Sequence, residues 1–188
     1  MPGGRAADGV GDVHFPIPRQ SVTEPGGHRA DNDARLGEEL AAVVSGARRR
    51  AVRDGDRQID TAHLLHSLLE HDSEARAVFE DGPQLARLLA YLVQRSIGYG
   101  LRWQGSVEDS GAVPVVAVTD GFSPLAAGAM EYAVERAVGR GGERAHGVDL
   151  LAALVMDPEA RAVEVLTHAG IDVKTVLGGI ERRLPDAW

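Results

Sequence analysis

Three histidines are the residues of this sequence that could most readily form a metal site. His63, His66 and His71 lie close together, and His63 and His66 are three positions apart, which places them on one face of a helix. The His-Glu-x-x-His pattern of zinc peptidases is missing, and no third ligand stands at a spacing typical of zinc sites. We therefore expect no metal. We interpret His63 as a partly buried residue at a helix start, with a ring nitrogen bonded to the backbone or to a carboxylate.

Motifs that support catalysis are missing. Serine, histidine and aspartate all occur, but no Gly-x-Ser-x-Gly elbow exposes a serine nucleophile. No Gly-x-x-x-x-Gly-Lys-Ser/Thr loop is present to cradle the phosphates of ATP. The absence of cysteine excludes a thiol nucleophile, a disulfide and a thiolate zinc site. We expect neither an enzymatic activity nor a cofactor.

The charge of the chain argues against nucleic acid as a partner. The formal net charge is −8, whereas affinity for phosphate backbones comes from clustered Lys and Arg. The basic cluster Arg48–Arg50 falls at the end of an expected helix, where cations complement the helix dipole, and we interpret it as a solvated helix terminus. No apolar run approaches the length of a transmembrane helix or resembles a signal peptide. The sequence predicts a cytoplasmic protein with no membrane partner.

A near-repeat dominates the sequence. The segment Thr61–Leu69 returns in similar form as Gly147–Val155, and the string Glu-Ala-Arg-Ala-Val occurs at both Glu74–Val78 and Glu159–Val163. One such unit has an apolar face that it cannot bury alone, whereas two stacked units share a core and leave a groove between them. The duplication therefore predicts two packed units of the same topology.

Helical periodicity gives each unit four helices, so we expect an all-α fold. Helix starts are marked by N-cap residues: Asp33 and Thr61 in the first unit, and Ser123 followed by Pro124 in the second. The expected helices cover residues 34–53, 61–69, 73–79 and 83–97, and then 124–140, 148–156, 157–169 and 172–184.

Two segments carry no helical period. Residues 1–33 are rich in Pro and Gly and are expected to form a disordered N-terminal extension. Residues 98–121 form a linker in which Val113–Thr119 has strand propensity, and Trp103 with Val107 would supply the partner strand of a small hairpin. The alternative is a loop that lies across the groove. The predicted domain spans 34–184, with repeat 1 at 34–97 and repeat 2 at 122–184.

These residues resemble the double Clp repeat, the N-terminal domain of the ClpC and ClpA unfoldases. That repeat opens with Phe-Thr and enters its second helix through Gly-Thr-Glu-His-Leu-Leu. The matching positions are Thr61, His63, Leu64, Leu65, Leu68 and Leu69 in the first repeat, and Phe122, Ser123, Ala126, Ala133, Ala137, Leu150, Leu151 and Leu154 in the second. The resemblance implies two pseudo-symmetric four-helix repeats in one domain, without the ATPase modules of the unfoldases.

The resemblance also implies a function. It indicates a non-enzymatic module that binds Clp protease components, their adaptors or their substrates, and that acts as adaptor, decoy or regulator. In members that read phosphorylated arginine, the Glu of the motif faces the guanidinium, but here Ala62 and Val148 stand at those positions. An uncharged side chain cannot form that ion pair, so we expect phosphoarginine binding to be lost or strongly weakened.

The binding surface is expected around the starts of the two repeats. The candidate peptide- or ligand-binding residues are Leu36, Ala62, Phe122, Ser123, Met130 and Val148. In actinobacterial relatives this domain is the target of cyclic-peptide antibiotics. Because the opening Phe is kept as Phe122 but is Leu36 in the first repeat, a hydrophobic cyclic peptide would meet one aromatic wall. The alternative function is therefore sequestration of a small molecule or cyclic peptide, which would give antibiotic tolerance, with residues 98–121 as a lid.

Overall fold

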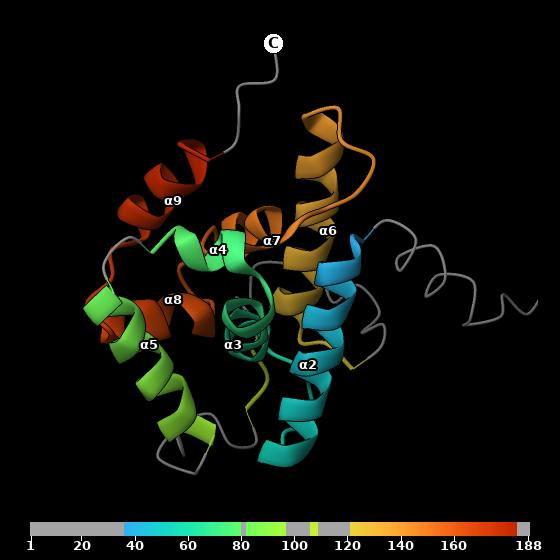
Figure 1. Cartoon of the computed structure of the whole chain (residues 1–188). Coiled ribbons are helices and arrows are strands. Elements are labelled where there is room, and N and C mark those ends of the chain that lie inside the picture. Colours follow the sequence, from blue (N-terminus) through green and yellow to red (C-terminus); the bar gives the residue numbers. More distant parts are fainter. Residues whose placement is uncertain (1–35, 80–81, 97–105, 109–120, 184–188) are drawn as a thin grey trace, which may run out of the picture.

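The computed structural model describes residues 36–79, 82–96, 106–108 and 121–183 of the 188-residue chain. The described part contains eight helices and no strand, as the helical periodicity predicts (Figure 1). The helices are α2 (Glu38–Asp54), α3 (Thr61–His71), α4 (Ser73–Ala77), α5 (Gly82–Gln94), α6 (Pro124–Gly139), α7 (Gly147–Leu154), α8 (Arg161–His168) and α9 (Val173–Glu181).

Several helix boundaries differ from the prediction. α2 begins at Glu38, so the predicted start near Asp33 is wrong: Gly37 is the N-cap, with an extended backbone. α3 is capped by Asp60 rather than by Thr61, which is its first residue. α8 begins at Arg161 instead of Asp157, because the preceding residues form a turn. Local sequence patterns predict that a helix is present, but its first and last residues also depend on competing backbone contacts.

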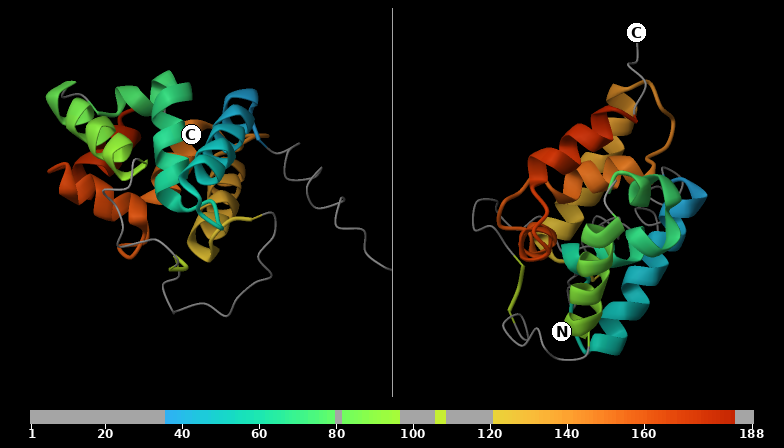
Figure 2. Two further views of the ribbon diagram at one scale, coloured as in Figure 1. Left: turned by 90° about the horizontal axis from the view of Figure 1, so that it is seen from below. Right: turned by 60° about the vertical axis from the view of Figure 1, so that its left-hand side comes forward.

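The core forms around α3, which packs against α2, α4, α5, α6, α7 and α8 (Figure 1). Both α3 and α7 are buried along almost their whole length, including polar residues such as Ser67 and Asp149. The turned views in Figure 2 show the other helices arranged around this pair. The fully buried large side chains, which are mostly leucines, are Leu40, Leu64, Leu65, Leu68, Leu69, Leu88, Leu92, Leu150, Leu151, Leu154, Leu166 and Ile180. Burial of such side chains is the main favourable contribution to folding.

Two isolated β-bridges join the halves in a reciprocal way. Leu36, before α2, pairs with Ala145, before α7, while Phe122, before α6, pairs with Ile59, before α3. In each half, the residue before the first helix thus pairs with the residue before the second helix of the other half. The matching helices α2 and α6, and α3 and α7, begin 86 residues apart. This reciprocal pattern supports a two-fold relation between the halves, which stays a prediction.

Parts of the sequence-based prediction lie outside the described residues. The N-terminal extension 1–33 and the proposed hairpin around Trp103 and Val113–Thr119 belong to them, and of the 98–121 linker the structure describes Ser106–Glu108 and Gly121. None of the described helices is both long enough and apolar enough to cross a bilayer.

Candidate functional site

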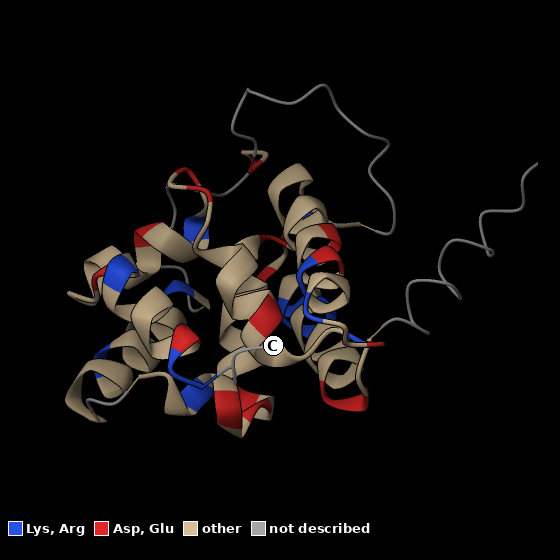
Figure 3. Ribbon diagram, turned by 90° about the horizontal axis from the view of Figure 1, so that it is seen from above, with Lys and Arg blue, Asp and Glu red and all other residues tan. Residues whose placement is uncertain are grey.

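A groove of about 780 Å³ lies where the two halves meet. Its lining comes from both halves: Glu39, His71, Asp72, Ser73, Glu74 and Ala77 from the first, and Arg140, His146, Val148 and Arg183 from the second. Most of these side chains are polar, and both signs of charge are present. Seen from above, acidic and basic segments are interspersed over this end of the molecule (Figure 3). The groove is therefore suited to a polar ligand that forms ion pairs and hydrogen bonds.

The structure places only one of the six predicted binding residues in the groove lining. Val148 lines the groove and is 4% exposed. Ala62 and Ser123 are fully buried, so their side chains present no surface to a partner. The other predicted positions are Leu36, buried in a bridge with Ala145, Phe122, half-buried in a bridge with Ile59, and Met130, half-buried against the core.

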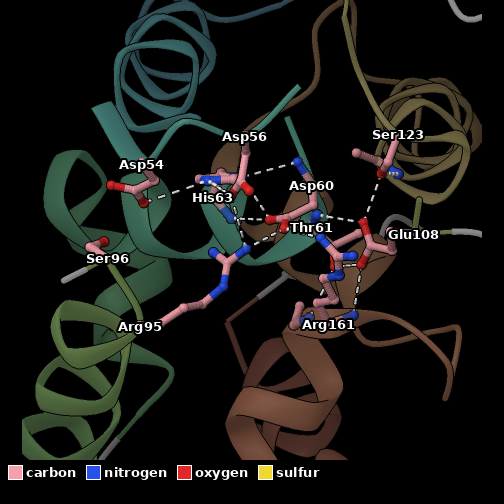
Figure 4. Close-up of polar contacts among 12 residues, drawn as sticks. Asp54, Asp56, Asp60, Thr61, His63, Arg95, Ser96, Glu108, Ser123 and Arg161 are labelled. Carbon is pink, nitrogen blue, oxygen red and sulfur yellow. Dashed lines mark hydrogen bonds and ion pairs between the residues drawn. The ribbon is translucent and has the colours of Figure 1, made fainter. Parts of the chain in front are cut away.

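A second polar region is buried between the halves, at the start of α3 (Figure 4). Asp60 caps α3 by accepting a hydrogen bond from the His63 N–H at 2.8 Å, and the Asp60 N–H donates to His63 Nδ1 at 3.1 Å. Arg95 from the first half and Arg161 from the second both pair with Asp60. The carboxylate of Asp60 therefore links a helix cap to cations from both halves.

Neighbouring charges and hydrogen bonds shift the pKa values of Asp60 and His63 in this region. Burial alone would raise the pKa of Asp60, but the hydrogen bond and charge of His63, with Arg95 and Arg161, outweigh burial and hold that pKa well below its usual range. Burial alone would lower the pKa of His63, but the neighbouring carboxylates of Asp56 and Asp60 outweigh burial and raise it above its usual range. The region is thus a network of compensating buried charges.

Glu108, from the linker, is a second buried carboxylate beside this network. It accepts hydrogen bonds from the Thr61 N–H at 2.9 Å, the Ser123 hydroxyl at 2.7 Å and the Arg161 N–H at 2.7 Å, and from the Thr61 hydroxyl (Figure 4). These donors stand at the starts of α3, α6 and α8. Burial, then the charge of Asp60, raise the pKa of Glu108. Glu108 therefore fastens the linker to both halves.

One group of described residues has the spacing of a metal site: Asp56, Asp60 and His63. Arg95 forms ion pairs with both carboxylates of this group, at 3.6 Å for Asp56 and more closely for Asp60. A guanidinium thus stands where a metal cation would have to bind, and the arrangement fits a salt-bridge network better than a metal centre.

The Asp60–His63 pair has the contact between an acid and an imidazole that is typical of a hydrolytic triad. The second ring nitrogen of His63, Nε2, however, faces two further carboxylates. His63 Nε2 lies 3.2 Å from Asp56 and 3.7 Å from Asp54, without an aligned hydrogen bond. Within the described ranges no hydroxyl group contacts this nitrogen. The pair therefore has no nucleophile to activate there.

The second half builds a similar junction in which the acid and the imidazole have exchanged positions. His146 is the N-cap of α7, and its N–H donates to Asp149 at 3.0 Å, so the acid and the imidazole have changed places relative to Asp60 and His63. Arg140 pairs with the buried Asp149. In both halves a buried aspartate at the start of the second helix, Asp60 or Asp149, is thus paired with arginine.

Sequence reasoning missed the residues that organise these sites. Asp60 stands directly before the predicted cap Thr61 and could have been found from the capping preference of Asp. For Asp72, which caps α4, the sequence indicates a helix start near Asp72 or Ser73 but not its place in the groove. Glu108 lies in the linker without a periodic neighbour, and nothing in the sequence marks it.

Comparisons with protein-family models and with curated proteins find no match. Solved structures do match. The N-terminal domain of ClpD, a caseinolytic protease associated chaperone from Arabidopsis thaliana, has 19% sequence identity and a TM-score of 0.55, over 79% of this chain and 94% of that chain. The chain has the fold of a Clp N-terminal domain.

Two further structures share the Clp N-terminal fold with this chain. The N-terminal domain of Hsp104 from Candida albicans has a TM-score of 0.57 and 12% identity, over 77% of this chain and 88% of that chain. A protein from a malarial secretion system has a TM-score of 0.58 and 14% identity, over 79% and 94% of the two chains. The all-α Clp N-terminal fold that the resemblance implies is confirmed, and the pseudo-symmetry of its two repeats stays a prediction.

Proposed function

We propose that this chain is a non-enzymatic module that binds a protein or peptide segment in the groove between its halves. The observation that carries the proposal is the groove itself, with a volume of about 780 Å³ and a lining drawn from both halves. Its polar lining and open walls suit an extended segment that forms hydrogen bonds and ion pairs. In this proposal the buried network at Asp60 and Glu108 is structural and holds the halves together.

We further propose that the partners belong to Clp proteolysis. The Clp N-terminal fold supports this class of partner, which comprises Clp subunits, their adaptors or their substrates. We propose that the chain acts there as an adaptor, a decoy or a regulator.

The test uses a variant that fills the groove and a matched variant that does not. Ala77 is exposed and lines the groove, so Ala77→Trp blocks it without entering the core. Ala42 is exposed on α2 outside the groove lining, so Ala42→Trp is the control. The immobilised full chain is exposed to lysate of its native cells, and Clp subunits and substrates are quantified by mass spectrometry. We expect them with the wild type and the control and not with Ala77→Trp; recovery with none of the three proteins contradicts the proposal.

The alternative, sequestration of an apolar small molecule or cyclic peptide, finds less support. Only Ala77 and Val148 are apolar among the ten residues that line the groove, whereas small-molecule pockets are mostly apolar. A thermal-shift screen separates the two hypotheses, because a tight ligand that binds only the folded state raises the melting temperature.

A further inference from the structure

The starts of α3, α6 and α8 together hold the carboxylate of Glu108 between the halves (Figure 4). Its Oε2 accepts the Thr61 N–H at 2.9 Å and the Ser123 hydroxyl at 2.7 Å. Its Oε1 accepts the Arg161 N–H at 2.7 Å and the Thr61 hydroxyl. We call Thr61, Ser123 and Arg161 the carboxylate receptor. None of the three lines the groove, so the receptor is a separate site.

The receptor presents donors only, and the helical part of the chain fixes their direction. The Thr61 hydroxyl oxygen already accepts the Ala162 N–H at 2.9 Å. The Ser123 hydroxyl oxygen likewise accepts the Ala126 N–H at 3.1 Å. Because each oxygen is used as an acceptor, each hydroxyl proton is directed at the carboxylate. An amide there would set its NH₂ group against two donors, so the receptor selects a carboxylate.

The corresponding positions of the other half lack these hydroxyl donors. Gly37 stands directly before α2, as Ser123 stands before α6. Gly147 is the first residue of α7, as Thr61 is of α3. The receptor therefore belongs to one junction and is not a general consequence of the repeated helices.

The occupant of the receptor comes from a short segment outside the helices, Ser106–Glu108, which we call the strap. Of its residues only Glu108 is buried, and Val107 is 59% exposed, so the strap inserts a carboxylate but no apolar side chain. Arg161 Nη2 also donates to the Ser106 carbonyl at 3.0 Å and to the Ser106 hydroxyl at 2.7 Å. Such hydrogen bonds replace hydrogen bonds to water, so a polar attachment is weaker than one that also buries apolar surface.

We propose that the strap is an autoinhibitory internal ligand, and that an acidic peptide segment of a partner protein takes its place at the carboxylate receptor. The segment repeats the chemistry of the strap, with a serine two residues before a glutamate. Its glutamate accepts the hydrogen bonds that Glu108 accepts, and its serine accepts from Arg161 Nη2. This second site goes beyond the proposed function, which concerns the groove.

The test is fluorescence polarisation of a labelled heptapeptide that copies residues 104–110, beside a peptide with Gln in place of its Glu. The full-length Glu108→Ala variant leaves the receptor without its occupant, so it should bind the Glu peptide roughly tenfold more tightly than the Gln peptide. The wild type should bind the Glu peptide roughly tenfold more weakly than Glu108→Ala, because tethered Glu108 competes at a high effective concentration. Val107→Ala, which keeps the occupant, is the matched control and should bind as the wild type does.

A second pair of variants tests the receptor itself in the Glu108→Ala background. Ser123→Gly removes one donor but keeps an acceptable N-cap, and it should weaken binding of the Glu peptide roughly tenfold. Ser45→Ala changes an exposed serine of α2 outside the receptor and should leave the affinity unchanged. Melting curves establish that each variant is folded. If Glu108→Ala does not fold, Glu108→Gln replaces it, because an amide fits the receptor poorly.

The outcomes separate this inference from the proposed function. Equal binding of the Glu and Gln peptides to Glu108→Ala, or equal binding of the Glu peptide to Glu108→Ala and the wild type, would overturn the inference. Absence of binding to the wild type at millimolar concentration would overturn it too, since the strap would then be permanent. If adding Ala77→Trp to Glu108→Ala abolishes binding, the peptide docks in the groove, which contradicts this inference and supports the proposed function. Binding that survives Ala77→Trp supports the receptor as a separate site.

Discussion

Replacing Glu108 with alanine tests whether the linker fastens the two halves. The change removes the acceptor for two backbone N–H groups, those of Thr61 and Arg161, and for two hydroxyls. The hydroxyls can rotate to other acceptors, but each buried N–H left without a partner costs about 1–3 kcal/mol. Part of this cost is offset because burial and the charge of Asp60 disfavour the Glu108 carboxylate. We expect a net loss of about 3 kcal/mol in the free energy of unfolding.

Thermal and urea unfolding measure this loss. For a domain of this size a change of 1 kcal/mol shifts the melting temperature by about 2–4 °C, so Glu108→Ala should unfold about 6–12 °C lower than the wild type. Glu108→Gln keeps a carbonyl acceptor and should lie between the two. The neighbouring Val107 is 59% exposed, and Val107→Ala serves as the control that should leave the melting temperature unchanged.

The pH dependence gives a second readout of the same interaction. Because the pKa of Glu108 is raised in the folded state, the folded chain holds this proton to higher pH than the unfolded chain. The stability of the wild type relative to Glu108→Gln should therefore decrease as pH rises from about 4.5 through the folded-state pKa. If Glu108→Ala melts together with Val107→Ala, and no such slope appears, the linker does not hold the halves and the reasoning is refuted.

Three other predictions concern the helix contacts and the groove. Gly46→Ala should lower stability by about 1–3 kcal/mol in urea unfolding, despite the better helix propensity of Ala, because a Cβ would lie 2.2 Å from Ser67 Oγ; a gain in stability would contradict the close contact. Burial, then the charge of Arg50, lower the pKa of His66 to about 4, so the unfolded chain binds more protons between that pH and 6.5. Wild-type stability should fall as pH drops through this window, and His66→Gln should lose that part of the slope; equal slopes would count against the burial of His66. A phosphoarginine peptide should bind weakly in calorimetric titration because Ala62 and Val148 are uncharged, and micromolar affinity would overturn this expectation.

Much of the fold was predictable because its signals are local. The spacing of apolar residues predicts the helices, and Ser123 followed by Pro124 predicts the start of α6, where Ser123 accepts the Ala126 N–H at 3.1 Å. The similarity of Thr61–Leu69 to Gly147–Val155 predicts two similar apolar helices, and both α3 and α7 are buried helices in the structure. Such patterns need only neighbours within one or two turns.

The sites were less predictable because their contacts join residues far apart in the sequence. Glu108 bonds to Thr61, 47 residues away, and to Arg161, 53 residues away. No local pattern marks such a residue in a linker without helical period. The predicted binding residues were chosen by their place in the motif, yet Ala62 and Ser123 are buried and only Val148 reaches the groove lining.

The sequence by itself determined that the chain folds into helices, since helix periodicity and N-caps are properties of adjacent residues. Only the tertiary structure decided what each buried carboxylate does. Glu108 and Asp72 are both acidic residues outside a helix interior, and no sequence pattern distinguishes the roles of their carboxylates. They differ because packing brings four donors to Glu108, whereas it brings only the Ala75 N–H to Asp72 and leaves its second oxygen at the groove.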